Sequence, residues 1–221
     1  MVINAILTFI AVFVSLIVHE VAHGYIALKF GDDTAERHGR LSFNPIKHID
    51  YFGTIILPLL LFFSKMGFVF GWAKPVPIDY DKLKQKKIGI ILTSMAGVLA
   101  NICLAIIFAL LLKIILFLPR FSTDGWLAMF CFQMIFINSA LAVFNLLPIP
   151  PLDGARIFFG WAKNRWARKY MSLENYGLSA VVILMFILPA VLLAFDVKFN
   201  PLVSLVKFVT TWLMRLIIQG I

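Results

Sequence analysis

Charged residues are scarce in this chain. Only 14% of its 221 residues are Asp, Glu, Lys or Arg, whereas 62% are hydrophobic. Soluble domains are roughly half apolar and about a quarter charged. The composition therefore excludes an ordinary soluble domain.

Cysteine is nearly absent as well. Cys103 and Cys131 are the only two, and both stand inside apolar runs. They lack the paired spacing, such as Cys-x-x-Cys, that is typical of metal and redox sites. We therefore expect both to be buried small hydrophobic residues, without a disulfide or metal role.

No soluble basic module carries the net charge of +9. Nucleic-acid-binding domains place basic and aromatic side chains together on a soluble fold, and no stretch of this chain provides one. We therefore expect no nucleic-acid partner. Basic loops facing the anionic lipid of a bilayer explain the charge better.

Long apolar runs dominate what is present, and several reach the roughly 20 residues that span a bilayer. The first run lacks the basic start and small-residue cleavage site of a signal peptide, so we expect it to be retained. We predict an all-α membrane protein, a polytopic transmembrane helix bundle that forms a single membrane-embedded domain over 1–221. Its core covers about 4–160, and its C-terminal helices lie within about 177–221. The expected helices are 4–30, 89–118, 126–147, 177–195 and 201–219. The last is either a spanning or an interfacial helix, because it contains Lys207 and Arg215.

The basic residues predict an orientation. Loops 72–88 and 149–176 hold five Lys or Arg each, whereas the link 119–125 holds one. Because Lys and Arg favour the cytoplasmic side, both loops are predicted to be cytoplasmic. The first helix has no Lys or Arg before Lys29, which places its N-terminus outside. We expect a multi-pass protein of the cell membrane.

This orientation constrains the segment 53–71, which must then enter and leave the membrane on the same side. Pro58, Lys65 and Gly67 interrupt its apolar run. Irregular backbone is tolerated at membrane depth where protein or a water-filled cavity covers it. We predict a re-entrant or β-like element between the first and second core helices. The alternative is a full transmembrane helix, for which the run is apolar enough.

The sequence HEVAH at 19–23 places two histidines and a glutamate inside the first apolar run. Residues four apart share one face of a helix, so His19 and His23 can reach one metal ion. Glu20 stands beside that ion, where a general base can take a proton from water and pass it to a leaving amine. Polar side chains that are only hydrogen-bonded inside the bundle are the alternative. The complete five-residue pattern favours the metal site.

A catalytic zinc ion needs a third protein ligand and leaves its fourth position open. His38 and His48 lie in a polar loop, and we expect both at the surface. Asp153 follows a proline-broken stretch, NLLPIPPLDG at 145–154, at the same predicted depth as HEVAH. It is the candidate ligand, with an ordinary turn as the alternative. Asn145 either holds a substrate carbonyl or oxyanion, or makes a helix cap or interhelical hydrogen bond.

HEVAH and NLLPIPPLDG together resemble the two defining motifs of the site-2 protease family, the intramembrane zinc metalloproteases of peptidase family M50. The stretches 39–58, 70–77 and 96–101 resemble further parts of that family, so that the similarity covers most of residues 10–160. The resemblance implies one zinc ion bound by His19, His23 and Asp153. It also implies Glu20 as the catalytic base and then acid, and Asn145 as a residue that positions the substrate.

The implied activity is cleavage within or beside the transmembrane segment of a membrane protein. The chain looks like a minimal, prokaryotic-type member, because neither a PDZ nor a CBS domain is found. Val98 stands where the family often has proline, whereas Asn101 is kept, and we assign no catalytic role to Asn101. The alternative function is a divalent-metal transporter or a zinc-dependent membrane scaffold, whose membrane histidines and acids would line a pathway.

Two further stretches have a predicted role. FGWAKPVP at 70–77 is either an exposed strand edge that pairs with unwound substrate, or an interfacial loop anchored by Trp72 and Lys74. The basic and aromatic stretch RIFFGWAKNRWARKY, at 156–170, is predicted to lie on the cytoplasmic membrane surface.

Overall fold

A computed structural model describes residues 2–63, 71–118, 125–174, 176–177, 183, 188, 191 and 201–220. Long apolar helices dominate it. Those long and apolar enough to cross a membrane are α1 (Val2–Lys29), α4 (Lys86–Phe117), α5 (Trp126–Asn145) and α10 (Pro201–Gly220). The described part of the chain contains no β-strand. The predicted all-α membrane helix bundle is confirmed.

Short helical elements connect the long ones. Between α1 and α4 lie α2 (Thr34–Arg37), η1 (Pro45–His48), η2 (Tyr51–Ile56) and α3 (Leu57–Phe63). After α5 come α6 (Asp153–Ala155), η3 (Arg156–Gly160) and α7 (Arg165–Met171).

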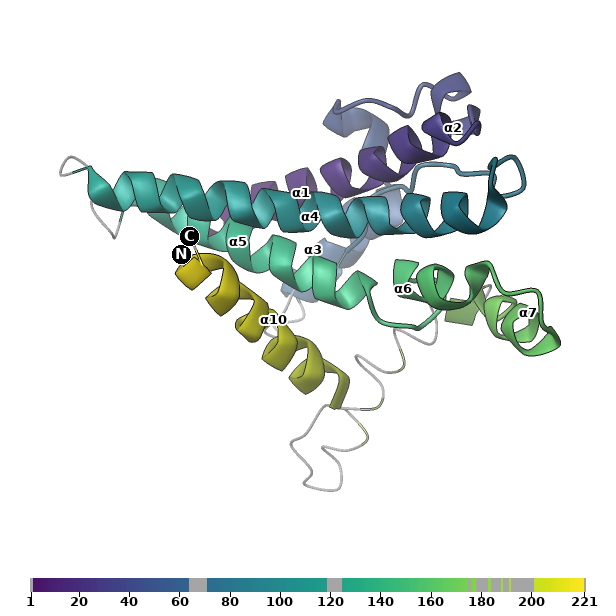
Figure 1. The fold of residues 1–221 in the computed structure, drawn as a ribbon. Coiled ribbons are helices and arrows are strands. Elements are labelled where there is room, and N and C mark those ends of the chain that lie inside the picture. Colours follow the sequence, from purple (N-terminus) through teal and green to yellow (C-terminus); the bar gives the residue numbers. More distant parts are fainter. Residues whose placement is uncertain are drawn as a thin grey trace.

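Helix α4 packs against both α1 and α5 (Figure 1). Small residues allow the close approach that membrane helices need. Ala105 and Ala109 of α4 contact a buried cluster that includes Ile135 of α5 and Met214 and Ile217 of α10. This packing along α4 and α5 favours a spanning rather than an interfacial α10. The expected helix 177–195 falls almost entirely outside the described residues.

The two basic loops lie at the same end of the bundle. The C-terminal end of α1, the start of α4 and the α6–α7 region gather there, whereas both chain termini lie at the opposite end (Figure 1). This arrangement is the one that the charge-based orientation requires. Which end faces the cytoplasm remains a prediction.

The segment after η1 fits the re-entrant prediction. Elements η2 and α3 together cover residues 51–63, which at 1.5 Å per residue reach roughly 20 Å, short of the bilayer's ~30 Å. The Trp72 N–H donates to the Gly53 carbonyl at 3.1 Å, and the Thr54 hydroxyl donates to the Trp72 carbonyl at 2.8 Å. The chain therefore returns to the point where the segment began. Residues 64–70 lie outside the described part.

Two burial predictions were wrong. His48 is completely buried, and its Nε2 donates to the Ser42 carbonyl at 2.7 Å, whereas His38 is exposed as expected. The loop that contains His48 folds against the extended stretch 71–79, as shown by the hydrogen bond from Lys74 N–H to the His48 carbonyl. Cys131 is buried, but Cys103 lies on the exposed face of α4. An apolar run does not reveal which of its faces meets lipid, because lipid and protein core are equally apolar.

Asp32 ties the extended stretch 71–79 to the end of α1. This buried carboxylate accepts hydrogen bonds from the backbone and hydroxyl of Thr34 through Oδ1, and from the Asp79 N–H at 2.7 Å through Oδ2. Burial acts to raise the pKa of Asp32, but the hydrogen bonds from Thr34 and Asp79 outweigh burial and lower the pKa. The ionised form is therefore favoured in the folded protein, and its contribution is lost only as the pH falls through that lowered pKa.

We predict that Asp32→Ala loosens this stretch. Hydrogen bonds to a charged group contribute about 1.5–3 kcal/mol, so hydrogen exchange at the Asp79 amide should accelerate roughly tenfold or more. Hydrogen–deuterium exchange with mass spectrometry measures this. Asp33→Ala, which removes only a surface ion pair with Arg37, is the matched control. Equal exchange rates at the Asp79 amide in the two variants would contradict the proposed role of Asp32 in holding the stretch 71–79.

Candidate metal centre

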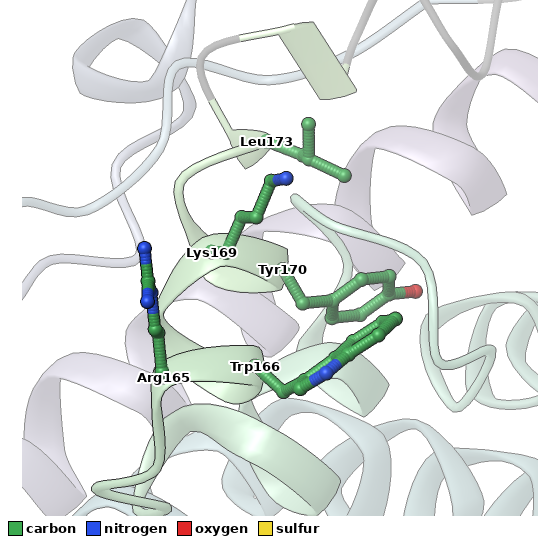
Figure 2. Close-up of a pocket in the computed structure, with 5 residues that line it drawn as sticks. All are labelled: Arg165, Trp166, Lys169, Tyr170 and Leu173. Atoms are coloured by element: carbon green, nitrogen blue, oxygen red, sulfur yellow. The ribbon is translucent and has the colours of Figure 1, made fainter.

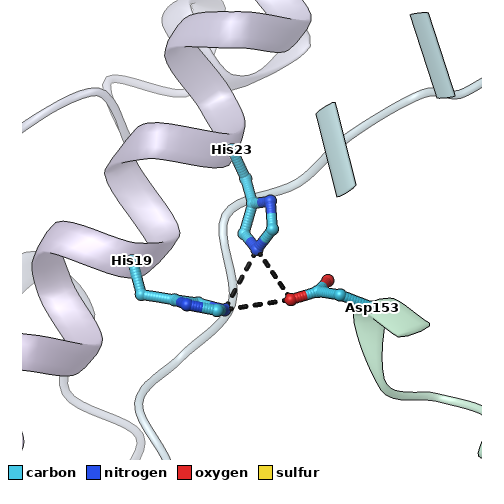
Figure 3. A group of neighbouring side chains, drawn as sticks. All are labelled: His19, His23 and Asp153. Carbon is cyan, nitrogen blue, oxygen red and sulfur yellow. Dashed lines mark hydrogen bonds and ion pairs between the residues drawn. The ribbon is translucent and has the colours of Figure 1, made fainter. Parts of the chain in front are cut away.

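His19, His23 and Asp153 converge inside the bundle (Figure 3). The two Nε2 atoms are 3.0 Å apart, and each is 3.2 Å from Oδ2 of Asp153. The three residues are 4%, 5% and 8% exposed, respectively. The structure thus brings together the three side chains predicted from the sequence to be metal ligands. It leaves His38 and His48 outside this group.

Proline-broken backbone carries Asp153 to the histidines. Helix α5 ends at Asn145, and Asp153 begins the single turn of α6. Its neighbour Gly154 lies against the end of α5, where an added Cβ would stand 2.2 Å from the Leu146 carbonyl oxygen. Only glycine permits this approach, which accounts for the Asp-Gly pair of the motif.

Gly97 of α4 provides the space for both imidazoles. A Cβ at this position would lie 2.4 Å from Nε2 of His23 and 2.5 Å from Cε1 of His19. Gly97 belongs to the stretch AGVLAN at 96–101, which resembles part of the family, but no role for Gly97 was predicted from the sequence. A glycine beside a site leaves no signal in a single sequence, because only the neighbouring helix reveals what it accommodates.

The histidine rings are held through their Nδ1 atoms. His23 Nδ1 lies 2.6 Å from the Thr93 carbonyl oxygen, which only accepts, so His23 Nδ1 carries the proton. His19 Nδ1 lies 2.6 Å from Oδ1 of Asn101. A neutral ring that is protonated at Nδ1 presents a lone pair at Nε2. Both Nε2 atoms therefore face Asp153 as electron-pair donors.

The donor set fits a zinc ion. Among the described residues, no hydrogen-bond donor reaches Oδ2 of Asp153, although the atom is buried. Three converging electron-pair donors repel one another unless a cation lies between them. Imidazole nitrogen and carboxylate oxygen are ordinary zinc ligands.

Glu20 lies beside this group and is held from the backbone. Its Oε2 accepts the Val76 N–H at 2.8 Å. A cavity of about 660 Å³ opens here, and its walls include His19, Glu20, His23, Asn145 and Asp153. The contact with Val76 could not be predicted from the sequence, because a backbone donor leaves no trace in residue identity.

Asn145 and Tyr80 also line the cavity. The Asn145 amide donates to the Leu141 carbonyl of its own helix at 3.0 Å. An amide has a second N–H, so this bond does not exhaust it. Burial raises the pKa of the Tyr80 hydroxyl, so this side chain stays neutral and polar.

A second hollow lies along α7 and the residues just after it (Figure 2). It is lined by Arg165, Trp166, Lys169, Tyr170 and Leu173. Tyr170 donates to the Pro148 carbonyl, and Trp166 is 83% exposed. An exposed tryptophan among basic side chains fits the predicted position at the membrane surface, which stays a prediction.

We predict that Gly97→Ala abolishes high-affinity metal binding, because the added methyl group must displace His19, His23 or both. A displaced ligand of this kind should weaken zinc binding roughly 100-fold or more, beyond the ~10–100-fold cost of losing an outer-shell partner. Competition with a chromophoric zinc chelator measures the affinity. Gly220→Ala, where an added Cβ meets nothing within 4 Å, is the control. Wild-type affinity in Gly97→Ala would disprove the assigned role of Gly97.

Comparison with known proteins is consistent with this site. The family model of peptidase family M50 matches residues 114–189, which include Asp153. The protein YwhC of Bacillus subtilis, provisionally named a zinc metalloprotease, is 40% identical over 185 residues, covering 81% of this chain and 80% of YwhC.

Two more relatives carry the same provisional name. MJ0611 of Methanocaldococcus jannaschii is 33% identical over 175 residues, covering 78% of this chain and 79% of MJ0611. Rip2 of Mycolicibacterium smegmatis is 32% identical over 176 residues, covering 77% of this chain and 63% of Rip2. No solved structure matches the chain significantly. On the strength of these relatives, the chain belongs to peptidase family M50, the family of the site-2 proteases.

Proposed function

We propose that this chain is an intramembrane zinc metalloprotease, which hydrolyses peptide bonds in or beside the transmembrane segments of membrane proteins. The observation that carries the proposal is the buried group of His19, His23 and Asp153, whose ligand atoms all lie within 4.8 Å of one another. Membership of peptidase family M50 and the membrane-length helices support it. The described part of the chain acts, in this proposal, as one membrane-embedded catalytic unit.

His19, His23 and Asp153 would hold one zinc ion. Zinc in this position supplies a Lewis acid, which makes water more acidic and polarises a peptide carbonyl. Glu20 would act as the general base, taking the proton of the attacking water and then delivering it to the leaving amine. The Val76 N–H holds Oε2 of Glu20, and in this proposal the other oxygen, Oε1, would face that water. Asn145 would direct its second amide N–H to the substrate carbonyl.

The extended stretch 71–79 forms one wall of the cavity and is our candidate for substrate contact. On one side, the N–H groups of Trp72, Lys74 and Val76 donate to Gly53, His48 and Glu20, respectively. The guanidinium of Arg40 donates to the Lys74 carbonyl at 2.7 Å and fixes the stretch further. An extended backbone of this kind can pair with an unwound substrate segment. Residues 71–79 form no β-strand in the structure, so a substrate-pairing edge at 70–77 remains a proposal. Phe70 lies outside the described residues.

The proposed topology places the N-terminus outside and the catalytic group in the cytoplasmic half of the membrane. The histidines stand in the C-terminal half of α1, the half nearer the basic loops. Polar connections at that end would give water a route to the cavity. The substrate would reach the same group from the bilayer.

A metal transporter is less well supported. A pathway would require metal-binding groups spaced across the membrane. Among the described residues, His19, His23 and Asp153 form the one buried cluster with metal-ligand geometry.

We predict that Glu20→Gln keeps zinc and loses proteolysis. Glutamine can still accept the Val76 N–H but cannot take up a proton, and removing general acid–base catalysis typically costs 10²–10⁴-fold in rate. Quantitative proteomics of membranes from cells carrying either form should show uncleaved membrane proteins accumulating in the variant. Glu36→Gln, an exposed acid on α2, is the control. Unchanged cleavage, or altered metal flux without accumulated substrate, would count against a protease.

The topology has its own prediction. In a variant without Cys103 and Cys131, Trp126→Cys should react with a membrane-impermeant maleimide on intact cells, because the start of α5 faces outside. Lys84→Cys should react only after the membrane is opened. Both replaced side chains are exposed, so access depends on the side of the membrane. The reverse labelling pattern would show that the orientation is inverted.

A further inference from the structure

A connected set of polar side chains lies in the bundle behind His19. Ser15 of α1, Asn101 of α4 and Asn138 of α5 are each 0% exposed. Burying polar groups is costly unless their hydrogen bonds are satisfied. These three side chains join three helices and end at the metal-facing histidine, so their arrangement bears directly on the site.

Two backbone carbonyls fix the orientation of the Asn138 amide: that of Met134 acts directly, and that of Ala11 acts through the Ser15 hydroxyl. One of its amide atoms lies 2.8 Å from the Met134 carbonyl oxygen and 2.8 Å from the Ser15 hydroxyl. A carbonyl oxygen only accepts, so the atom facing it must be the donor Nδ2. Ser15 gives its own proton to the Ala11 carbonyl at 2.6 Å and therefore accepts from Asn138. Oδ1 of Asn138 must point the other way, towards Asn101.

The same reasoning passes to Asn101 and then to His19. Oδ1 of Asn138 only accepts, so the Asn101 atom 2.8 Å away is the donor Nδ2, which also lies 3.5 Å from the Ser15 carbonyl. Oδ1 of Asn101 is then the atom 2.6 Å from Nδ1 of His19. Because that oxygen only accepts, Nδ1 must carry the proton. His19 is thereby left with its lone pair on Nε2, facing Asp153.

We propose that Asn138 is a positioning residue for the metal centre: through Asn101 it sets the tautomer and ring orientation of His19. This inference rests on the proposed function of His19 as a zinc ligand. His23 needs no such positioning residue, because the Thr93 carbonyl accepts the hydrogen bond from its Nδ1 directly. The bond between Asn101 and His19 has no inherent direction, because an amide can present either its oxygen or its nitrogen. Asn138 removes that freedom.

The direct test is the zinc affinity of the purified full chain in detergent, measured by chelator competition at fixed pH. Asn138→Leu keeps the approximate volume but removes the nearer acceptor of Asn101, at 2.8 Å, and leaves only the Ser15 carbonyl at 3.5 Å. The Asn101 amide can then turn its nitrogen towards His19 more readily. We expect zinc binding to weaken roughly tenfold, the lower end of the ~10–100-fold cost of losing an outer-shell partner. Ser139→Ala is the matched control, because Ser139 is a buried neighbour on α5 whose hydroxyl has no hydrogen-bond partner within the described structure. Unchanged affinity in Asn138→Leu would overturn the proposal.

Repeating Asn138→Leu in an Asn101→Asp protein distinguishes a positioning role of Asn138 from a role in packing alone. In Asn101→Asp, every oxygen of the side chain can accept from His19, so the orientation of this residue no longer depends on Asn138. Replacing Asn138 by Leu in that background should cause no further loss of zinc affinity, a coupling that a double-mutant cycle measures. The same tenfold loss in both backgrounds would show that Asn138 has only a structural role. Nitrogen NMR of ¹⁵N-histidine-labelled, metal-free protein provides a second readout, the His19 tautomer, which should move towards Nε2–H in Asn138→Leu.

His19→Ala tests the underlying assumption. Loss of zinc from His19→Ala together with wild-type affinity in Asn138→Leu would reject the positioning role alone. Zinc retained in His19→Ala would reject the proposed metal centre and, with it, the positioning role.

Discussion

The structure depends most on the convergence of two imidazole nitrogens and one carboxylate oxygen inside a membrane helix bundle. These three atoms lie 3.0–3.2 Å apart. Electron-pair donors held so close together in a medium of low dielectric constant repel one another unless a cation is shared. The rest of the bundle serves to impose this arrangement. Gly97 makes room for the rings, and proline-broken backbone after α5 turns Asp153 towards them.

The same arrangement connects the buried site to the polar end of the molecule. Asp32 and Arg40 hold the extended stretch 71–79 against the end of α1, and Val76 within that stretch holds Glu20. Each link is a hydrogen bond to a backbone group, which tolerates changes of side chain along the stretch. The candidate base, the wall of the cavity and the loops at this end are therefore positioned together. For a protease, this would place the base and a substrate-binding edge in one unit.

Much of this could be predicted from the sequence, because membrane helices and the HEVAH pattern have strong, local signals. Asp153 could be selected because helix depth and charge bias agreed with the needs of a metal ion. Burial within the helices could not be predicted: Cys103 faces outwards and His48 is enclosed. Lipid-facing and core-facing positions share one composition, and loop burial depends on long-range packing. The roles of Gly97 and Asn138 appear only when α1, α4 and α5 are placed side by side, since each acts on a residue of another helix.

The central claim is that His19, His23 and Asp153 hold one zinc ion. X-ray absorption spectroscopy at the zinc edge, on purified protein with one equivalent of zinc, measures the ligands directly. The account predicts two histidine nitrogens at about 2.0–2.1 Å, oxygen ligands at about 2.0–2.2 Å and no sulfur. Loss of the histidine scattering in a His19→Ala, His23→Ala variant would assign those nitrogens. A sulfur ligand, or histidine scattering that survives both replacements, would contradict the account.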